Sequence, residues 1–136
     1  MARKQVTGES DLNTLLASMS PYLDEEEYVF WSAKGACYGD HIDLQPVASC
    51  MEAEGLTLVI AKSTADANQI SYDATFKRIT LKVHSSLEAV GLTAAFATKL
   101  GEHGISANVI AGYFHDHIFV QSALADKAMI ALGELS

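Results

Sequence analysis

Hydrophobic and polar positions alternate on either side of a helical stretch in the second half of the chain. Residues 79–83 alternate between apolar and polar, which is the period-two pattern of a strand with one buried face. Over residues 92–100 the apolar positions recur at the three- and four-residue spacing of a helix, and alternation returns over 105–111. Residues 118–120 are again apolar. The pattern predicts a strand, a helix and then two strands that form a hairpin.

The first half shows a similar but weaker pattern. A helix is predicted over residues 12–19, and Pro21 ends it because proline disfavours helical geometry in the residue before it. The acidic run Asp24–Glu27 is expected to form a solvated turn. Residues 34–46, rich in glycine and aspartate, predict a long loop, here called the excursion. The other predicted elements are strands over 28–31, 47–52 and 56–60, a short helix over 64–69 capped by Ser63, and an amphipathic C-terminal helix over 124–132.

Two stretches of the first half align with stretches of the second. Leu56–Ile70 aligns with Asp116–Ile130 at an offset of 60 residues, and the apolar strand triplets fall on each other. The helical positions 12–16 align with 92–96 at an offset of 80 residues, and the excursion roughly accounts for the difference between the two offsets. Two matches in the same chain order indicate a tandem duplication.

The predicted fold class is α+β. Each copy follows the ferredoxin-like βαββαβ plan, in which an antiparallel sheet carries both helices on one face. The predicted domains are residues 1–73, a divergent copy with the inserted excursion at 34–46, and residues 74–136. The uncovered sheet faces and edges favour a homo-oligomer, with a dimer as the expected form.

Composition narrows the function classes. The chain has 136 residues, 49% of them hydrophobic, and a formal net charge of −8, which fits a folded acidic domain. This charge argues against nucleic acid as a partner, and no basic amphipathic or long apolar stretch suggests a membrane partner. The N-terminus lacks the apolar core of a secretory signal, so a cytoplasmic location is expected. Two cysteines are too few for a disulfide scaffold or a structural zinc site.

Two clusters contain metal-ligating residue types. His115-Asp116-His117 could serve a metal or a His–Asp base, but consecutive strand residues point to opposite faces, and the internal match places the triplet at a hairpin tip. A turn is therefore the preferred interpretation. Asp40, His41 and Asp43 with Cys37 match no standard zinc or calcium spacing, so they are interpreted as a polar loop. No metal, cofactor or catalytic residue is predicted.

A family resemblance appears over the second half of the chain. It is carried by the strand 79–83, the loop 84–91, the helix 92–100 and the strand 104–110. These segments resemble the ACT domain of the aspartokinase type, a small regulatory module of amino-acid-controlled enzymes. The whole chain resembles small stand-alone bacterial tandem-ACT proteins, strongly over 52–120 and only in pattern over the first fifty residues.

The resemblance implies that an amino acid or similar small molecule binds at an interface between ACT-like domains. A helix N-terminus has unpaired N–H donors that suit a carboxylate, and a glycine there allows close approach. The ordinary alternative is a strand-to-helix connection capped by Ser85 or Ser86. Asn108 could bind an α-amino or carboxylate group, or could be a structural amide. The predicted ligand-binding residues are His84, Ser85, Ser86, Leu87, Glu88, Ala89, Val90, Gly91 and Asn108.

Three functions follow as hypotheses. The first is a non-enzymatic regulatory module that binds an amino acid. The second is a structural or protein-interaction module without a ligand. The third is a small metal-dependent enzyme that uses His115-Asp116-His117. The first copy lacks a counterpart of the loop 84–91, so one site per chain is expected.

Overall fold

The computed structural model describes residues 20–82 and 91–135. The predicted helix over 12–19 and the loop residues 83–90 lie outside the described residues. The chain forms two compact units: unit 1 consists of Met1–Asp24 and Lys77–Ser136, and unit 2 of Glu25–Phe76. Unit 2 is thus inserted into the sequence of unit 1.

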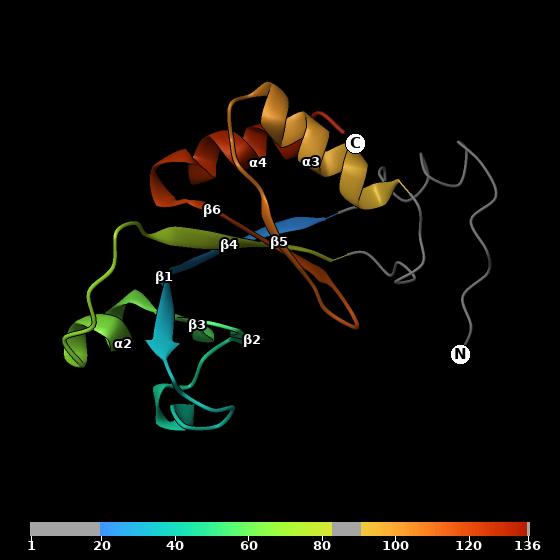
Figure 1. The fold of residues 1–136 in the computed structure, drawn as a ribbon. Coiled ribbons are helices and arrows are strands. Elements are labelled where there is room, and N and C mark those ends of the chain that lie inside the picture. Colours follow the sequence, from blue (N-terminus) through green and yellow to red (C-terminus); the bar gives the residue numbers. More distant parts are fainter. Residues whose placement is uncertain (1–19, 83–90, 136) are drawn as a thin grey trace. The chain divides into compact units, whose positions relative to one another are not determined.

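Unit 1 is a sheet with two helices on one face (Figure 1). The first residues of β1 (Pro21–Lys34) are followed in the sheet by β4 (Phe76–Leu81), β6 (Asp116–Gln121) and β5 (Asn108–Ala111). The helices are α3 (Leu92–Glu102) and α4 (Ala125–Gly133), which contact each other; the short 3-10 helix η2 (Ser122–Leu124) precedes α4. This arrangement confirms the predicted ferredoxin-like plan, with strand, helix, strand, strand and helix in chain order.

The core of unit 1 lies between the sheet and the two helices. Strand residues that alternate along β4 and β6 meet the inner faces of α3 and α4 there, as the periodicity predicts. The buried residues are Ile79, Leu81, Leu92, Phe96, Leu100, Ile105, Ile118, Val120, Ala125, Ala128, Ala131 and Leu132.

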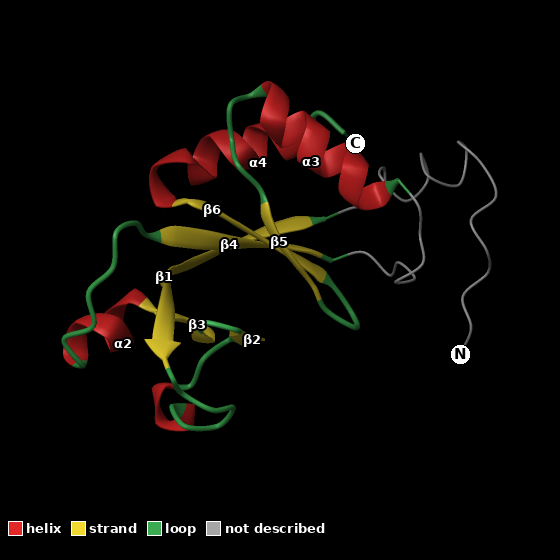
Figure 2. Cartoon of the chain, in the orientation of Figure 1, coloured by secondary structure: helices red, strands yellow, loops and turns green. Residues whose placement is uncertain are grey.

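Unit 2 is a smaller sheet in the order β2-β3-β1, where β2 is Ala48–Glu52 and β3 is Gly55–Ala61. β3 pairs antiparallel with both neighbours. The helix α2 (Lys62–Ala67) follows β3, and the excursion contains the 3-10 helix η1 (Ile42–Leu44) among loops (Figure 2). The core of unit 2 consists of Val29, Leu44, Leu56, Leu58, Ile60 and Ala65.

Four local predictions were wrong. Asp24–Glu27 lies inside β1 rather than in a turn; Leu23 packs against the core of unit 1, and Tyr28 and Val29 are buried in the same strand. The helix α2 starts after Ala61, so Ser63 is not its cap. The strand predicted from residue 105 begins at Asn108.

The fourth concerns the hairpin. Its turn is Gly112–His115, closed by the Gly112 N–H donating to the His115 carbonyl over 2.9 Å, whereas Asp116 and His117 already belong to β6. In the described parts of the chain, no helix is long and apolar enough to cross a membrane.

Candidate functional site

The candidate site is the connection from β4 to α3, which contains the predicted loop. Its far end is Gly91, the residue that precedes α3. Gly91 has φ 96°, in the left-handed region where a Cβ is disfavoured, and its carbonyl accepts the Ala95 N–H over 2.9 Å. Glycine has no side chain to cap the first N–H groups of the helix. These donors and the positive end of the helix dipole suit a carboxylate.

The near end of the connection is held by the neighbouring strands. The Lys82 N–H donates to the Ser20 carbonyl over 3.2 Å, and the Lys82 ammonium lies 4.6 Å from the centre of the Tyr22 ring. On the other side, Thr80 Oγ1 lies 2.9 Å from His117 Nδ1. The end of β4 therefore lies beside the start of β6, and the chain leaves β4 from a fixed position.

Asp116 and His117 lie at this end of the sheet but face opposite ways. Asp116 is buried, 9% exposed, and shares its strand face with Ile118 and Val120 of the core, whereas His117 faces the other side toward Thr80. Burial raises the pKa of Asp116, against the opposing charges of His117 and His115. Burial also lowers the pKa of His117, and the charges of Arg78 and His115 add to that effect. The two side chains do not form a His–Asp base pair.

Asn108 lies at the start of β5 on the sheet face away from α3, because its neighbour Val109 packs against the core. Its side chain is exposed, and Nδ2 donates to the Phe119 carbonyl over 3.0 Å. The structure does not bring Asn108 and Gly91 onto one face of the sheet. The other predicted ligand-binding residues, His84 to Val90, lie outside the described residues.

The cluster in the excursion has local contacts. The Cys37 N–H donates to Asp40 Oδ2 over 2.7 Å, and the His41 ring lies edge-on to Trp31 with centroids 5.0 Å apart. Within residues 20–82 and 91–135, no group of three or more histidine, cysteine, aspartate or glutamate side chains is placed to hold a metal ion.

Unit 2 has an acidic depression that the sequence analysis missed. It encloses about 260 Å³ beside the start of α2. Lys62 Nζ lies 3.0 Å from Asp66 Oδ2, and Tyr72 donates to Asp66 Oδ1 over 2.8 Å. The hydrogen bonds from Tyr72 and Lys62 lower the pKa of Asp66. The negative charge disfavours a carboxylate ligand here. The acidic run Asp24–Glu27 was the sequence signal for this depression, but the run was interpreted as a solvated turn. The depression is lined by Glu25, Glu26, Glu27, Lys62, Ser63 and Asp66.

The fold and the connection together define a class: a chain with a ferredoxin-like module and a second, related unit, in which the helix α3 begins after a glycine that has no side chain to cap it. The family comparison identifies the class more closely. Profiles described as the ACT domain match residues 7–77 and 76–134. The chain belongs to the ACT-domain family, whose members commonly bind amino acids in regulatory roles.

Solved structures show the same fold. A crystal structure of a protein of unknown function from Vibrio cholerae, described as a possible transport protein, is 56% identical, with a TM-score of 0.84 over 93% of this chain and 96% of that one. An Agrobacterium tumefaciens protein is 14% identical, with a TM-score of 0.59 over 86% and 88%.

The ligand-free regulatory subunit of aspartate kinase from Thermus thermophilus is 8% identical, with a TM-score of 0.58 over 85% and 95%. At these low identities the last two show a shared fold. No match was found among curated proteins.

Proposed function

We propose that this protein is a non-enzymatic regulatory module that binds an amino acid at the β4–α3 connection of unit 1. The observation that carries the proposal is Gly91 in the left-handed region at the start of α3, in a chain matched twice by the ACT profile. The free N–H groups there would bind the α-carboxylate, and the backbone can approach it closely because Gly91 has no side chain.

The proposal includes a second ACT domain, from another copy of the chain, that completes the pocket. One domain offers the carboxylate site, and the ligand's side chain needs a wall that the partner would supply. Binding would then stabilise one arrangement of the two copies and alter their contacts with a regulated partner. A homodimer and a cytoplasmic location are parts of this proposal, and the domain limits of 1–73 and 74–136 stay a prediction.

The direct test is a thermal-shift panel of the common amino acids and divalent metal ions. A ligand at about a hundred times its Kd stabilises the folded state by about 2.7 kcal/mol, which raises the Tm by several degrees. We expect one amino acid, or one chemical group of them, to give this shift. A panel in which no amino acid shifts the Tm at millimolar concentration would remove the support for the proposal.

Two variants locate the site. Gly91→Ala adds a Cβ at a left-handed residue at the start of α3, and we expect it to weaken binding at least tenfold. Gly101→Ala is the matched control, because it adds the same atom to the same helix in open space, with no heavy atom within 4 Å. If both variants bind as the unmodified protein does, the ligand lies elsewhere.

A shift by a metal ion alone would instead favour a metal-dependent function. In that case His117→Ala, which removes the imidazole beside Thr80, should abolish the shift. An oligomer that forms equally well with and without every tested amino acid would favour an interaction module.

A further inference from the structure

The inner face of the unit 2 sheet is only partly covered. The register places Met51 of β2 opposite the core residue Leu56 of β3, and Ser49, two residues before Met51, points to the same side. Both side chains thus lie on the face that carries the core. Ser49 is nevertheless exposed, and Met51 is 53% exposed. The described residues therefore leave the inner face of β2 uncovered.

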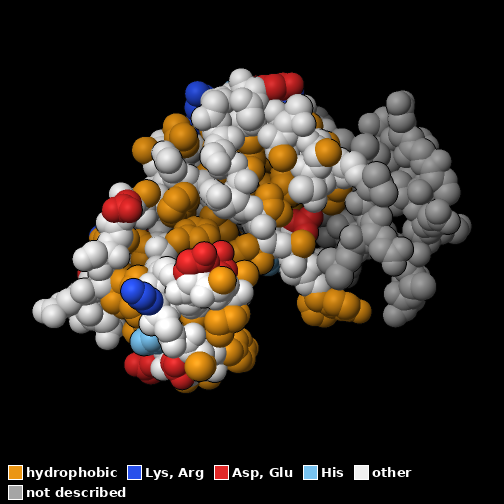
Figure 3. All heavy atoms as spheres, in the orientation of Figure 1, with side chains coloured by type: hydrophobic (Ala, Val, Ile, Leu, Met, Phe, Trp, Pro, Cys, Tyr) orange, Lys and Arg blue, Asp and Glu red, His pale blue; other side chains and the backbone are white. Residues whose placement is uncertain are grey.

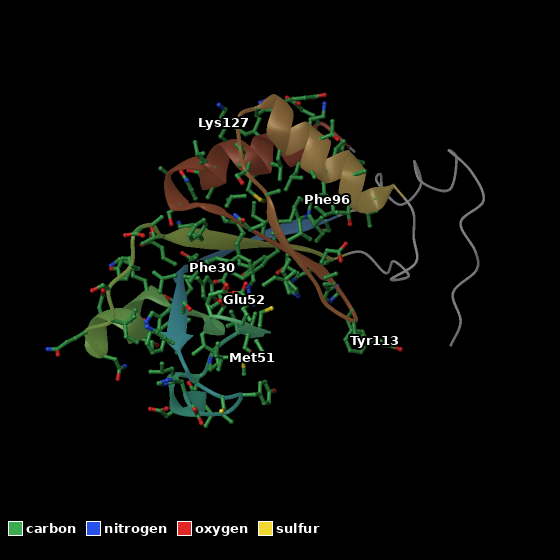
Figure 4. The ribbon with its side chains drawn as sticks, in the orientation of Figure 1. Phe30, Met51, Glu52, Phe96, Tyr113 and Lys127 are labelled. Atoms are coloured by element: carbon green, nitrogen blue, oxygen red, sulfur yellow. The ribbon has the colours of Figure 1, made fainter. Side chains whose placement is uncertain are left out.

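The corresponding strand of unit 1 is covered by a helix. At the 60-residue offset β5 corresponds to β2, and Val109, the counterpart of Ser49, packs against the core to which α3 contributes. Figure 4 shows Phe96, an inward residue of α3, between this helix and the sheet. In unit 2, the described residues 35–47 between β1 and β2 contain the three-residue helix η1 instead. The uncovered face of β2 thus corresponds to a face that a helix covers in unit 1.

The excursion covers the other part of this face. Leu44 enters the core of unit 2, and the His41 ring lies edge-on to Trp31 of β1, with ring centroids 5.0 Å apart. Other apolar side chains of the excursion and of β2 remain in solvent, and large exposed apolar patches are typical of interaction sites. Four such side chains, between 42% and 81% exposed, are here called the open surface: Tyr38, Ile42, Val47 and Met51.

The charges next to the open surface in the chain are negative. Residues 35–61 contain no lysine or arginine and four exposed carboxylates, which belong to Asp40, Asp43, Glu52 and Glu54. Figure 3 shows hydrophobic side chains (orange) beside acidic ones (red) on unit 2, and Figure 4 shows Met51 and Glu52 on β2. Such a surface attracts a cationic partner and repels an acidic one.

The same charges argue against a second copy of this chain as the occupant. A two-fold interface brings the same patch of both chains together, so the four carboxylates of one copy would meet those of the other. Like charges that meet across an interface disfavour binding. A partner that carries lysine or arginine beside its apolar side chains complements both the apolar and the acidic part of the surface.

We propose that the open surface binds an amphipathic helix of a partner protein, with lysine or arginine along the edges of its apolar face. The apolar side chains of this helix would cover Met51 and Ile42, and its cationic side chains would lie near the carboxylates. The helix would cover the inner face of unit 2 as α3 covers that of unit 1. This inference does not depend on an amino-acid ligand, so it can fail while the proposed function stands.

A model peptide tests the chemistry of the partner. The probe is the fluorescein-labelled peptide LKKLLKLLKKLLKL, whose leucines fall on one face of a helix and whose lysines fall on the other. The control is LEELLELLEELLEL, which keeps the apolar face and reverses the charge. By fluorescence anisotropy we expect the lysine peptide to bind in the micromolar range, and the glutamate peptide at least tenfold more weakly. Equal affinities for the two peptides, or no binding of the lysine peptide, would overturn the proposal.

Three variants locate the binding surface. Met51→Lys and Val47→Lys place a cation in the open surface, whereas Ile130→Lys replaces a side chain that is 69% exposed on α4 of unit 1. The change of net charge is the same in all three variants, so they differ in its location. We expect the first two to bind the lysine peptide at least tenfold more weakly and Ile130→Lys to bind it as the unmodified chain does, with circular dichroism spectra that show all three folded. Equal affinities in the three variants would mean that the overall negative charge holds the peptide, which contradicts the proposal.

Sedimentation tests the competing occupant. We expect the unmodified chain, Met51→Lys and Ile130→Lys to have the same oligomeric state, because the open surface is used by a different protein. A dimer that Met51→Lys dissociates and Ile130→Lys leaves intact would show that a second copy covers the open surface, and would overturn the proposal.

Discussion

Units 1 and 2 share one plan and differ in one connection. At the 60-residue offset, β6 and α4 of unit 1 correspond to β3 and α2 of unit 2, and the aligned residues Ala125 and Ala65 are both buried. The preceding edge strands, β5 and β2, also correspond. Between the first strand and the edge strand, however, unit 1 has the helix α3, and unit 2 has the excursion with the three-residue helix η1.

This difference distinguishes the residues that build the core from those that form the candidate site. In each unit, apolar side chains outside the sheet must cover its inner face. Phe96 of α3 does this in unit 1, and Leu44 of the excursion contributes to it in unit 2. Both arrangements give a buried core. Only α3, however, brings an eleven-residue helix with a glycine at its start, and this is the feature that suits a carboxylate.

The largest expected effect is the loss of stability when Phe96 or Leu44, the residues that cover the two sheets, is truncated. Phe96→Ala should lower the free energy of unfolding by about 3–5 kcal/mol, because the ring is fully buried and leaves a cavity. Leu44→Ala should cost about 2–3 kcal/mol, since a smaller side chain is lost from a short segment. Urea denaturation measures both. Phe114→Ala is the control at an exposed turn, where the change should stay within about 0.5 kcal/mol. Equal losses at all three positions would contradict the assignment of the cores.

The next effect concerns the start of α3. Gly91→Ala should cost about 1–2 kcal/mol, because a Cβ is strained in the left-handed region. Gly101→Ala, inside the same helix and with open space around the new atom, should instead stabilise by about 0.5–1 kcal/mol. The substitutions of Gly91, before α3, and of Gly101, inside it, should thus shift the urea midpoint in opposite directions. A shift in the same direction would mean that the conformation of Gly91 does not need glycine.

The smallest expected effect is on the pH dependence of stability and comes from the buried carboxyl group of Asp116. Where unit 2 has Leu56, unit 1 has Asp116, whose pKa burial raises. As the pH rises above the ordinary aspartate pKa of 3.8, the unfolded chain releases this proton first, so the contribution of Asp116 to stability falls.

Asp116→Asn should remove that loss and leave a protein whose stability falls less between pH 4 and neutrality. His117, whose lowered pKa has the opposite effect below pH 6.5, remains in the variant. Thermal melts across this range measure the slope. Asp73→Asn, at an exposed bend, should leave the slope unchanged.

Sequence periodicity predicted the elements in which buried residues recur at a regular spacing. It missed the segments whose structure depends on contacts with neighbouring strands. α3 and β4 were visible because each buries residues at a regular spacing. Asp24–Glu27 has no such signal, yet it continues β1, where Asp24 pairs with Arg78 of β4 over 3.1 Å. Asp116 is buried because β6 places it on the same face as Ile118 and Val120 of the core, which no local pattern of charge could indicate.

The candidate site was predicted in part. The glycine before α3 was visible as a loop signal, but its left-handed conformation was not, because the residue before a helix usually has an extended backbone. The use of the Asn108 amide within the sheet could not be predicted, because it depends on the register of β5 against β6. The sequence alone also cannot identify the ligand, since the residues that distinguish amino acids would come partly from a second domain.

The central claim is that unit 1 carries the amino-acid site and unit 2 does not. Isothermal titration of the unmodified chain with the amino acid that shifts its Tm tests this most directly. The account predicts one amino acid bound per chain and binding at least tenfold weaker in Gly91→Ala. Two amino acids per chain, or one that binds Gly91→Ala and the unmodified protein equally well, would contradict it.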